Sequence, residues 1–375
     1  MHLSISFLVT LSATYVTACD PSHQYHRRAP PVSNVPAPSP PIGNLTVGFT
    51  STIAAIPAPP TPVAGFFNTT SFPSQQQQNV TDFLEQAANL SKDWRIYQYF
   101  QDQCITQQVF PSLFSQPAGF VTPFTPFDSF YFIGHAFVSA WAFDTGDGLV
   151  VIDALDSSEE IEAIMLPALK QFGFSGNDIK HVIITHEHLD HYGGAKYLKE
   201  TFNSTIYASD LAWQEMATYN VPLNSTSYPP SRDVTLVDGQ VLTVGNVSIE
   251  TVLTPGHTPG TLSLIFPLTT KNGAEKHMAG LNGGTGNPQS AIDRTTKVLS
   301  QRRLASIAYE RGVDTLISNH HVADHALFNS DILAHSSPDA PNPFVIGRDN
   351  YYNYLNMLGL CTKVVAARQG MDLWV

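Results

Sequence analysis

Positive charge is scarce in this sequence of 375 residues, which has 19 lysines and arginines against 31 aspartates and glutamates. The formal net charge is −12, and charged residues of both signs make up only 13% of the chain. Binding to a nucleic-acid backbone needs clustered lysine and arginine, so we expect no nucleic-acid partner. In a chain with so few charges, the 14 histidines are the titratable side chains that most need an explanation.

Long apolar runs are also missing beyond residue 18, where no stretch reaches the roughly 18 apolar residues that a transmembrane helix needs. The first 18 residues hold an apolar stretch from Leu3 to Val16, which is typical of a secretory signal cleaved after Ala18. Basic residues are absent before Cys19, and a lipoprotein signal with a lipidated Cys19 is the alternative. We therefore predict a secreted, extracellular protein without a membrane span.

Only three cysteines are present, Cys19, Cys104 and Cys361. In an oxidising compartment Cys104 and Cys361 would form a disulfide between an N-terminal and a C-terminal helix, and two free buried thiols are the alternative. Sequons for N-glycosylation also fit a eukaryotic secretory route and predict a glycoprotein. The seven sequons begin at Asn44, Asn68, Asn79, Asn89, Asn203, Asn224 and Asn246.

The composition changes along the chain and divides it into four parts. After the signal at 1–18, residues 19–78 are rich in proline, serine and threonine, which predicts a disordered linker. Apolar residues at helical spacing predict an N-terminal helical extension over 79–121. From 122 to 375, short β-branched and aromatic runs alternate with helical segments in two similar halves, so we expect an α/β domain with helices outside two sheets.

The expected elements of that domain follow from the same patterns. We expect strands at 130–133, 138–143, 149–152, 181–184, 205–208, 241–244, 248–253, 261–266 and 314–318, and helices at 161–172, 195–201, 291–311 and 351–368.

The strongest chemical signal is the run His186-Glu187-His188-Leu189-Asp190-His191, which follows an apolar strand and precedes Gly193-Gly194. Where extended geometry continues past the strand, side chains two apart share a face, so His186 and His188 converge while Glu187 points away. The chain then turns and brings Asp190 and His191 to a neighbouring point. Imidazole and carboxylate are the ligands that zinc and similar metals prefer, so the run predicts a metal site; a histidine-rich surface loop is the alternative.

Three segments of the sequence resemble the metallo-β-lactamase superfamily. Thr185 completes the family's Thr-His-X-His-X-Asp-His pattern, and Gly256-His257-Thr258-Pro259-Gly260 matches the segment that supplies the next histidine ligand. The strand from Leu149 to Asp153 resembles the one whose terminal aspartate supports the ligand loop. The resemblance covers roughly residues 122–375 and implies the family's four-layer αββα sandwich.

The ligand set that the resemblance implies contains two zinc ions, although other divalent metals are possible. The first ion is expected on His186, His188 and His257, and the second on Asp190, His191 and a later histidine. For that last ligand the resemblance favours His320 in the segment Ser318-Asn319-His320-His321, with His321 as the alternative.

Many members of the superfamily also have an aspartate that bridges the two metals, and here Leu281 stands at that position. The departure resembles the subclass with Asp, His and His at the second zinc, and it argues against glyoxalase II, tRNA-processing nuclease and typical acyl-homoserine-lactone lactonase. The resemblance implies that metal-bound hydroxide, oriented by Asp190, opens a cyclic amide or ester of the β-lactam or lactone class. A persulfide dioxygenase-like oxidoreductase with one metal and a secreted non-catalytic binding protein are the alternatives.

The remaining candidate residues carry weaker signals. Asn282 and Thr285 lie in a glycine-rich segment between the third and last ligands, where they would bind a carboxylate or amide of a small-molecule substrate; a purely structural turn is the alternative. Trp141 and Tyr192 are expected to pack in the core, and a position at the border of the pocket is the alternative. Four histidines have no motif around them and are expected to be ordinary surface or packing residues: His135, His277, His325 and His335. The oligomeric state is not predicted by any of these patterns.

Overall fold

The computed structural model describes residues 71–375, except 110–120, 220, 221, 223, 224, 272, 274, 338 and 339. These residues fall within one compact unit, Val63–Val375. The predicted signal peptide and most of the predicted linker lie outside the described residues, as do Cys19 and the sequons at Asn44, Asn68 and Asn224. Within the described residues, no helix combines the length and the apolar character that crossing a membrane requires.

The first sheet has seven strands that follow one another in chain order. Its first four strands are antiparallel, and its last four run parallel to one another because helical segments connect them. The strands are β1 (Phe124–Phe127), β2 (Phe130–Phe132), β3 (Trp141–Asp144), β4 (Leu149–Ile152), β5 (Ile179–Ile183), β6 (Thr205–Ser209) and β7 (Val234–Leu236).

The second sheet has five strands in the order β12-β11-β10-β9-β8. All neighbouring pairs are antiparallel except β11 and β12, which run parallel. The strands are β8 (Val241–Val244), β9 (Val247–Leu253), β10 (Leu262–Thr269), β11 (Lys276–Asn282) and β12 (Thr315–Ser318).

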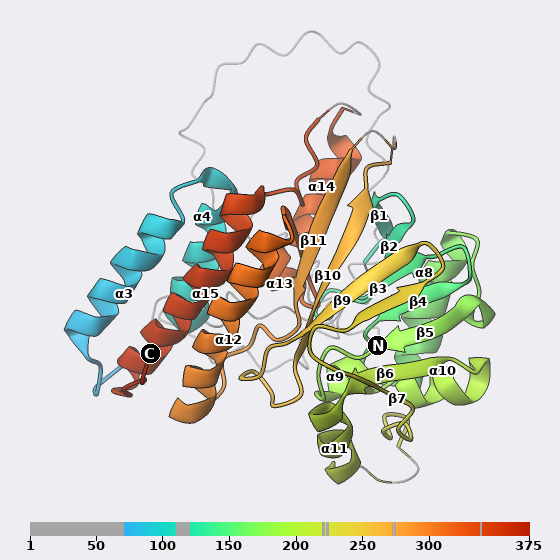
Figure 1. Cartoon of the computed structure of the whole chain (residues 1–375), viewed down its shortest axis with the longest axis horizontal. Coiled ribbons are helices and arrows are strands. Elements are labelled where there is room, and N and C mark those ends of the chain that lie inside the picture. The colour runs from blue at the N-terminus through green and yellow to red at the C-terminus, as the bar shows by residue number, and fades with distance from the viewer. Residues whose placement is uncertain are drawn as a thin grey trace, which may run out of the picture. The chain divides into compact units, whose positions relative to one another are not determined.

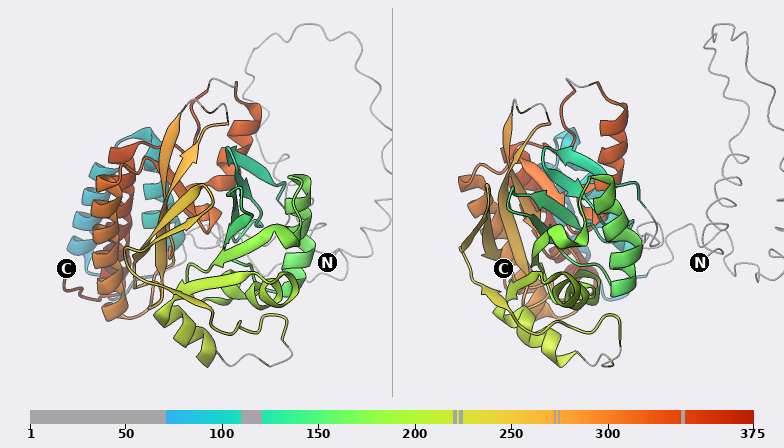
Figure 2. Two further views of the ribbon diagram at one scale, coloured as in Figure 1. Left: turned by 45° about the vertical axis from the view of Figure 1, so that its right-hand side comes forward. Right: turned by 90° about the vertical axis from the view of Figure 1, so that its right-hand side faces the viewer.

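Helices cover the outer face of each sheet, so that the described unit has four layers (Figures 1 and 2). The two outer layers face apolar clusters of their own, and a third cluster fills the space between the sheets. The helices are α3 (Gln77–Leu90), α4 (Trp94–Gln101), α5 (Gln107–Val109), α7 (Ser158–Glu160), α8 (Leu166–Gln171), α9 (Leu189–Tyr192), α10 (Ala195–Phe202), α11 (Asp210–Thr218), α12 (Ala291–Glu310), α13 (His321–Asp324), α14 (Ala326–His335) and α15 (Arg348–Arg368), with π-helical turns η2 (Asp102–Thr106) and η3 (Ile161–Met165) and a 3₁₀ turn η4 (Gly176–Asp178). The predicted αββα sandwich is confirmed.

Strand β4 shows how the sequence produces this layering. Leu149 and Val151 pack toward α8 and α10, whereas Val150 and Ile152 pack between the sheets. Because side chains alternate across a strand, a strand covered on both faces must be apolar at every position. All four residues of β4 are buried, and the strand ends at the mouth of the site described below.

A disulfide joins Cys104 in η2 to Cys361 in α15, as the sequence analysis predicted. Helix α15 lies beside α12 on one side and α3 on the other, shown in red, orange and blue in Figures 1 and 2. The bond therefore ties the helices that precede the sandwich to the layer that covers the second sheet.

Strands β1, β7 and β11 and helices α11 and α14 were not among the elements expected from the sequence. Strand β1 contains Pro126 and lies at one edge of the first sheet, where a missing N–H is tolerated. Strand β7 is three residues long at the opposite edge. Short edge strands have too few residues to show a clear alternation, so their pattern does not predict them.

Candidate metal centre

Three histidine side chains meet beyond the end of β5. His186 Nε2 lies 3.2 Å from His188 Nδ1 and 3.1 Å from His257 Nε2. His186 and His188 follow the strand directly, whereas His257 comes from the loop between β9 and β10. The three nitrogen atoms all lie within 4.8 Å of one another, and we call this group the first triad.

A second group of three forms next to the first. Asp190 and His191 lie on the short helix α9, and His320 follows β12. His191 Nε2 is 3.1 Å from His320 Nε2 and 3.3 Å from Asp190 Oδ2. The rings of His186 and His191 have centroids 4.0 Å apart, so this second triad is adjacent to the first.

In three of the histidines, the ring nitrogen that faces away from the triads has a hydrogen-bond acceptor, which indicates where the ring proton lies. His257 Nδ1 donates to the carbonyl of Gly286 at 2.9 Å, and His320 Nδ1 donates to the carbonyl of Phe137 at 2.9 Å. His191 Nδ1 donates to a carboxylate oxygen at 2.7 Å. In the neutral rings, the Nε2 atoms that face the triads therefore hold lone pairs.

Those lone pairs supply the test of whether the side chains fit metal ions. His191 Nε2 and His320 Nε2 face each other at 3.1 Å, and the Nδ1 of each ring faces an oxygen acceptor on the opposite side. Two lone pairs at this distance repel each other unless a proton or a cation lies between them. Imidazole and carboxylate are zinc ligands, so both triads fit a divalent metal.

The pKa values of the triad histidines show how burial favours the neutral, ligating form. Burial, followed by the neighbouring His191, lowers the pKa of His320 to about 4 and that of His186 well below its usual range. Burial and then Lys297 lower the pKa of His257. His191 differs: burial opposes its protonation, but Asp190 and Asp153 together raise its pKa to about 10.

Asp153 connects the end of β4 to the ligand run and is fully buried. Its Oδ1 accepts a hydrogen bond from the Thr185 backbone N–H at 2.8 Å, and its Oδ2 accepts from the Thr185 hydroxyl at 2.9 Å and from His191 Nδ1. Its backbone has φ of 64°, in the left-handed region that costs a non-glycine residue about 1 kcal/mol or more. The three hydrogen bonds offset this cost and orient the His191 ring.

Glu187 lies between two ligands but points away from both, as the strand alternation predicted. It is 3% exposed, and its carboxylate accepts hydrogen bonds from the Thr258 hydroxyl at 2.9 Å and the Gly260 N–H at 3.0 Å. Glu187 therefore attaches the loop of His257 to the strand of His186. The sequence analysis gave Glu187 no role, although an acidic residue directly after a buried strand was an available signal.

The segment after β12 places its two neighbouring histidines, His320 and His321, in different surroundings. His320 Nε2 faces the second triad, whereas His321 begins α13 and is not part of either triad. Asn319 donates hydrogen bonds to the Thr185 hydroxyl and to the Gly283 carbonyl, both at 2.9 Å. This buried amide, which the sequence analysis did not single out, joins three of the segments that form the centre.

The glycine-rich segment after β11 differs from its predicted role as a substrate-contacting loop. Asn282 is the last residue of β11 and is only 4% exposed. Thr285 is half-buried, and its carbonyl accepts a hydrogen bond from Lys297 at 2.6 Å. Leu281 is buried in the cluster between the sheets, beside its register partners Leu264 and Ile317, and it contributes apolar contact there.

A third cluster, His135 with Asp156 and Glu160, also places possible ligand atoms within 4.8 Å of one another. However, the backbone N–H of Phe137 points at His135 Nδ1 at 3.1 Å, so that Nδ1 holds the lone pair and Nε2 carries the proton. His135 Nε2 lies 3.5 Å from Glu160 and faces it as a donor. This tautomer does not fit metal ligation.

The other aromatic and histidine candidates have structural contacts. Trp141 is fully buried and donates from Nε1 to the Ser318 carbonyl at 2.8 Å, and Tyr192 is fully buried in the outer cluster. His277 pairs with Asp314 at 2.8 Å, and His325 pairs with Asp102 at 2.9 Å. His335 lies on the surface of α14, where its side chain is 76% exposed.

Residues 133–270 match the model of the metallo-beta-lactamase superfamily. An uncharacterized protein of Aquifex aeolicus is 33% identical over 126 residues, which cover 31% of this chain and 52% of that protein. A hydroxyacylglutathione hydrolase of Chelativorans sp. is 33% identical over 115 residues, which cover 31% and 38% of the two chains. This chain thus spans about half or less of the length of these curated relatives.

Solved structures share the fold. BJP-1, a subclass B3 metallo-beta-lactamase of Bradyrhizobium japonicum, superposes with a TM-score of 0.53 at 23% identity, covering 64% of this chain and 91% of that one. Native FEZ-1 metallo-beta-lactamase from Legionella gormanii gives 0.55 at 20% identity, covering 64% and 94%. The match over residues 133–270 agrees with the resemblance that the motifs predicted, and a similar protein of Bacillus velezensis, 32% identical over 83 residues, is named a probable polyketide biosynthesis zinc-dependent hydrolase.

Proposed function

We propose that this protein is a dinuclear zinc hydrolase that opens a cyclic ester or amide. The observation that supports it most is the pair of adjacent triads, which bring the ring nitrogens of five histidines and one carboxylate together. Two neighbouring metal ions are the arrangement that hydrolases use to hold both the attacking and the leaving oxygen.

The residues of the chain prepare the reaction by holding fixed positions. Zinc at the two triads would act as a Lewis acid toward the scissile carbonyl and lower the pKa of water toward about 7. Asp153 and Gly286 hold the rings of His191 and His257 so that Nε2 faces inward. Asp190 Oδ2 lies 3.7 Å from His320 Nε2, which places its carboxylate to ligate and to accept a proton from attacking water.

The surroundings of the triads favour a substrate without a free carboxylate. Phe137 is 40% exposed with its ring 4.9 Å from that of His320, and Leu189 on the ligand run is 36% exposed. Burial, followed by the nearby carboxylates of Glu160 and Asp190, raises the pKa of Asp156 to about 6, so acidic side chains gather on this side of the centre. The buried Lys297 donates to backbone carbonyls and is not free to bind a substrate anion. An apolar lactone or ester therefore suits the site better than an anionic β-lactam.

Metal analysis followed by a substrate panel tests the proposal. The purified protein should hold two zinc ions per chain and hydrolyse uncharged lactones with a kcat/KM at least about tenfold above that for β-lactam acids. A β-lactam and its carboxylate methyl ester provide a matched pair. Replacing His186 with alanine should abolish turnover, whereas the same change at the exposed His335 should have no effect.

Several outcomes would contradict the proposal. Activity that survives His186→Ala would show that the reaction occurs elsewhere. A single iron per chain with persulfide oxidation would favour the oxidoreductase alternative, and two bound metals without turnover across the panel would favour a binding protein. Cleavage confined to phosphodiesters would replace the ester and amide class.

We also propose that the protein is secreted and glycosylated. The disulfide between Cys104 and Cys361 supports an oxidising compartment. Four sequon asparagines in the described residues are exposed: Asn79, Asn89, Asn203 and Asn246. N-terminal sequencing should find Cys19 as the first residue, and a peptide N-glycosidase should lower the apparent mass. An uncleaved leader or an unchanged mass would contradict the respective part.

A further inference from the structure

Lys297 is a buried lysine that belongs to none of the ligand motifs. It lies on α12 and is 3% exposed. Its Nζ donates hydrogen bonds to the carbonyls of Thr285 at 2.6 Å and Gly286 at 2.5 Å. An ammonium group in the interior costs several kcal/mol unless its donors are satisfied, so a solvent-exposed position would be the default.

One of these two carbonyls also holds a ligand of the first triad. The Gly286 carbonyl accepts a hydrogen bond from His257 Nδ1, so the oxygen is shared between the imidazole and the ammonium of Lys297. The loop fits closely against the ring, since a Cβ on Gly286 would lie 2.7 Å from His257 Cε1 and a Cβ on Gly284 would lie 2.6 Å from His257 Cβ. A shift of the loop would therefore move the ring.

The backbone of α12 contacts the other side of the same ligand loop. A Cβ on Gly256, which has φ of 131°, would lie 2.4 Å from Lys297 Cα. One turn further, the Ser300 hydroxyl donates to the Pro255 carbonyl at 2.7 Å. Lys297 thus lies where α12, the loop of His257 and the glycine-rich segment meet.

We propose that Lys297 is a positioning residue for the first triad. By anchoring the segment 283–287, it keeps the Gly286 carbonyl behind His257 and directs His257 Nε2 toward His186. Lys297 therefore acts on His257 through the shared Gly286 carbonyl. The inference deepens the proposed function, because it rests on the first triad being a metal site.

Zinc affinity measured one triad at a time tests this role. His320→Ala removes a ligand of the second triad and leaves the first, and His257→Ala does the opposite. In the His320→Ala background, Lys297→Met should lower zinc affinity, measured by competition with a chromophoric chelator, by about 10- to 100-fold. In the His257→Ala background the same change should alter zinc affinity by less than about twofold.

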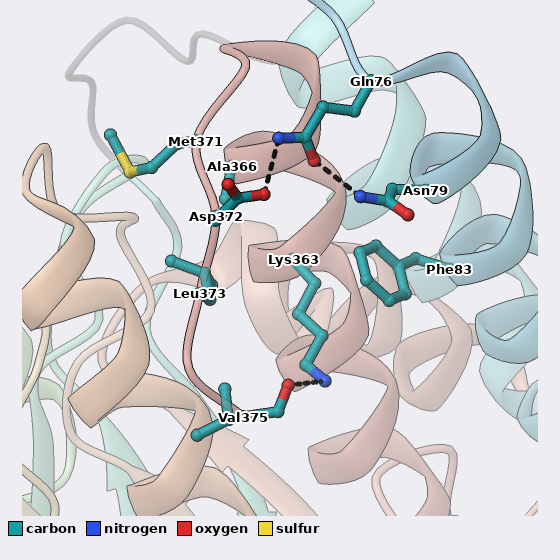
Figure 3. Close-up of a pocket in the computed structure, with 9 residues that line it drawn as sticks. All are labelled: Gln76, Asn79, Phe83, Lys363, Ala366, Met371, Asp372, Leu373 and Val375. Carbon is teal, nitrogen blue, oxygen red and sulfur yellow. Dashed lines mark hydrogen bonds between the residues drawn. The ribbon is translucent and has the colours of Figure 1, made fainter.

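A second buried lysine provides the matched control. Lys363 on α15 is 8% exposed and donates from Nζ to the Val375 carbonyl at 2.6 Å (Figure 3). The surrounding pocket is formed by α3, α15 and the C-terminal residues and contains no triad ligand. Lys363→Met also removes a buried ammonium from a backbone carbonyl, and it should leave zinc affinity unchanged in both backgrounds.

The outcomes separate this inference from the function on which it rests. Unchanged affinity of the first triad in Lys297→Met, or equal losses in both backgrounds, would overturn the positioning role while leaving the metal centre in place. Failure of the His320→Ala protein to bind zinc at all would instead contradict the metal centre. If Lys297→Met does not fold, Lys297→Gln takes its place; its amide still offers N–H donors, and this variant should lose affinity by a smaller factor.

Discussion

The two triads have the same number of ligands but differ in charge and in what lies behind them. The first consists of three imidazoles, and the outer nitrogen of His257 meets a carbonyl shared with Lys297. The second contains the carboxylate of Asp190, and the outer nitrogen of His191 meets the carboxylate of Asp153. The first triad therefore contains no carboxylate, whereas the second contains one and has another directly behind it.

This difference shows two ways of holding a metal site. The second triad would attract a divalent cation by charge. Two of its three side chains, Asp190 and His191, come from α9. The first depends on packing, because His257 is held by Glu187 from one side and by α12 from the other. We expect mutations of supporting residues to affect one triad without the other.

The largest effect is expected from Asp153→Ala. The change leaves the Thr185 N–H, the Thr185 hydroxyl and His191 Nδ1 without their acceptors in a fully buried place. Losing a buried, charged hydrogen-bond partner costs about 3 to 5 kcal/mol, so the free energy of unfolding should fall by that amount. Metal content should fall from two ions to one, because the second triad loses its oriented histidine.

Asp314→Ala is the control for Asp153→Ala, since Asp314 also pairs with a histidine, His277, but away from the triads. Chemical denaturation and metal analysis on both variants separate stability from metal binding. Loss of metal in Asp314→Ala, or two retained metals in Asp153→Ala, would remove the contrast between the triads.

An intermediate effect is expected from Glu187→Ala. The Thr258 hydroxyl and the Gly260 N–H lose a buried acceptor, which costs about 1 to 3 kcal/mol of stability. Zinc affinity of the first triad, measured in the His320→Ala background, should fall about 10- to 100-fold. Glu187→Gln retains one acceptor oxygen and should recover part of the affinity.

Glu250→Gln serves as the comparison for Glu187, because Glu250 pairs with the exposed Arg311. Surface ion pairs contribute about 0 to 1 kcal/mol, so this change should be close to neutral for stability and metal binding. If Glu187→Ala lowers the zinc affinity of the second triad more than that of the first, the glutamate does not act through His257.

A smaller effect, confined to substrate binding, is expected from Phe137→Ala. Burying a phenylalanine side chain against a ligand contributes about 1.5 to 3 kcal/mol, so KM for apolar lactones should rise roughly tenfold or more. The backbone carbonyl that accepts from His320 is kept, so metal content should not change. Phe328→Ala, at a 62% exposed position on α14, should leave KM unchanged; equal KM values in both variants would place the substrate elsewhere.

The smallest effect is expected from His321→Ala. His321 lies outside both triads, so metal content should stay at two ions per chain. The loss of its ring should change stability by about 1 kcal/mol or less. A loss of one metal would mean that His321, rather than its neighbour His320, completes the second triad.

Local patterns predicted those parts of the centre that adjoin one strand. The apolar β5 and the run after it predicted that His186 and His188 lie on one face. The apolar strand β4 likewise predicted that Asp153, which follows it, supports the ligand run. The joining of separate loops was not predictable in this way. Glu187, Asn319 and Lys297 act on segments that lie between 12 and 134 residues away along the chain, and no local period shows which loop a buried polar side chain will meet.

The structure also differs from the sequence prediction at Asn282 and in residues 161–172. Asn282 was expected at the substrate edge because a glycine-rich segment is usually exposed, but β11 extends through Asn282 and buries it. Residues 161–172 were expected as one regular helix, whereas η3 inserts a π turn before α8, which begins beside Pro167. For Asn282, the pairing of β11 with β12, which is distant in the sequence, decided the outcome.

Zinc content per chain in three proteins tests the central claim most directly: the wild type, His257→Ala and His320→Ala. If each triad holds one metal independently, elemental analysis after dialysis against buffered zinc will give two, one and one ions. Two ions retained in either variant, or fewer than two in the fully loaded wild type, would contradict a centre built from two triads.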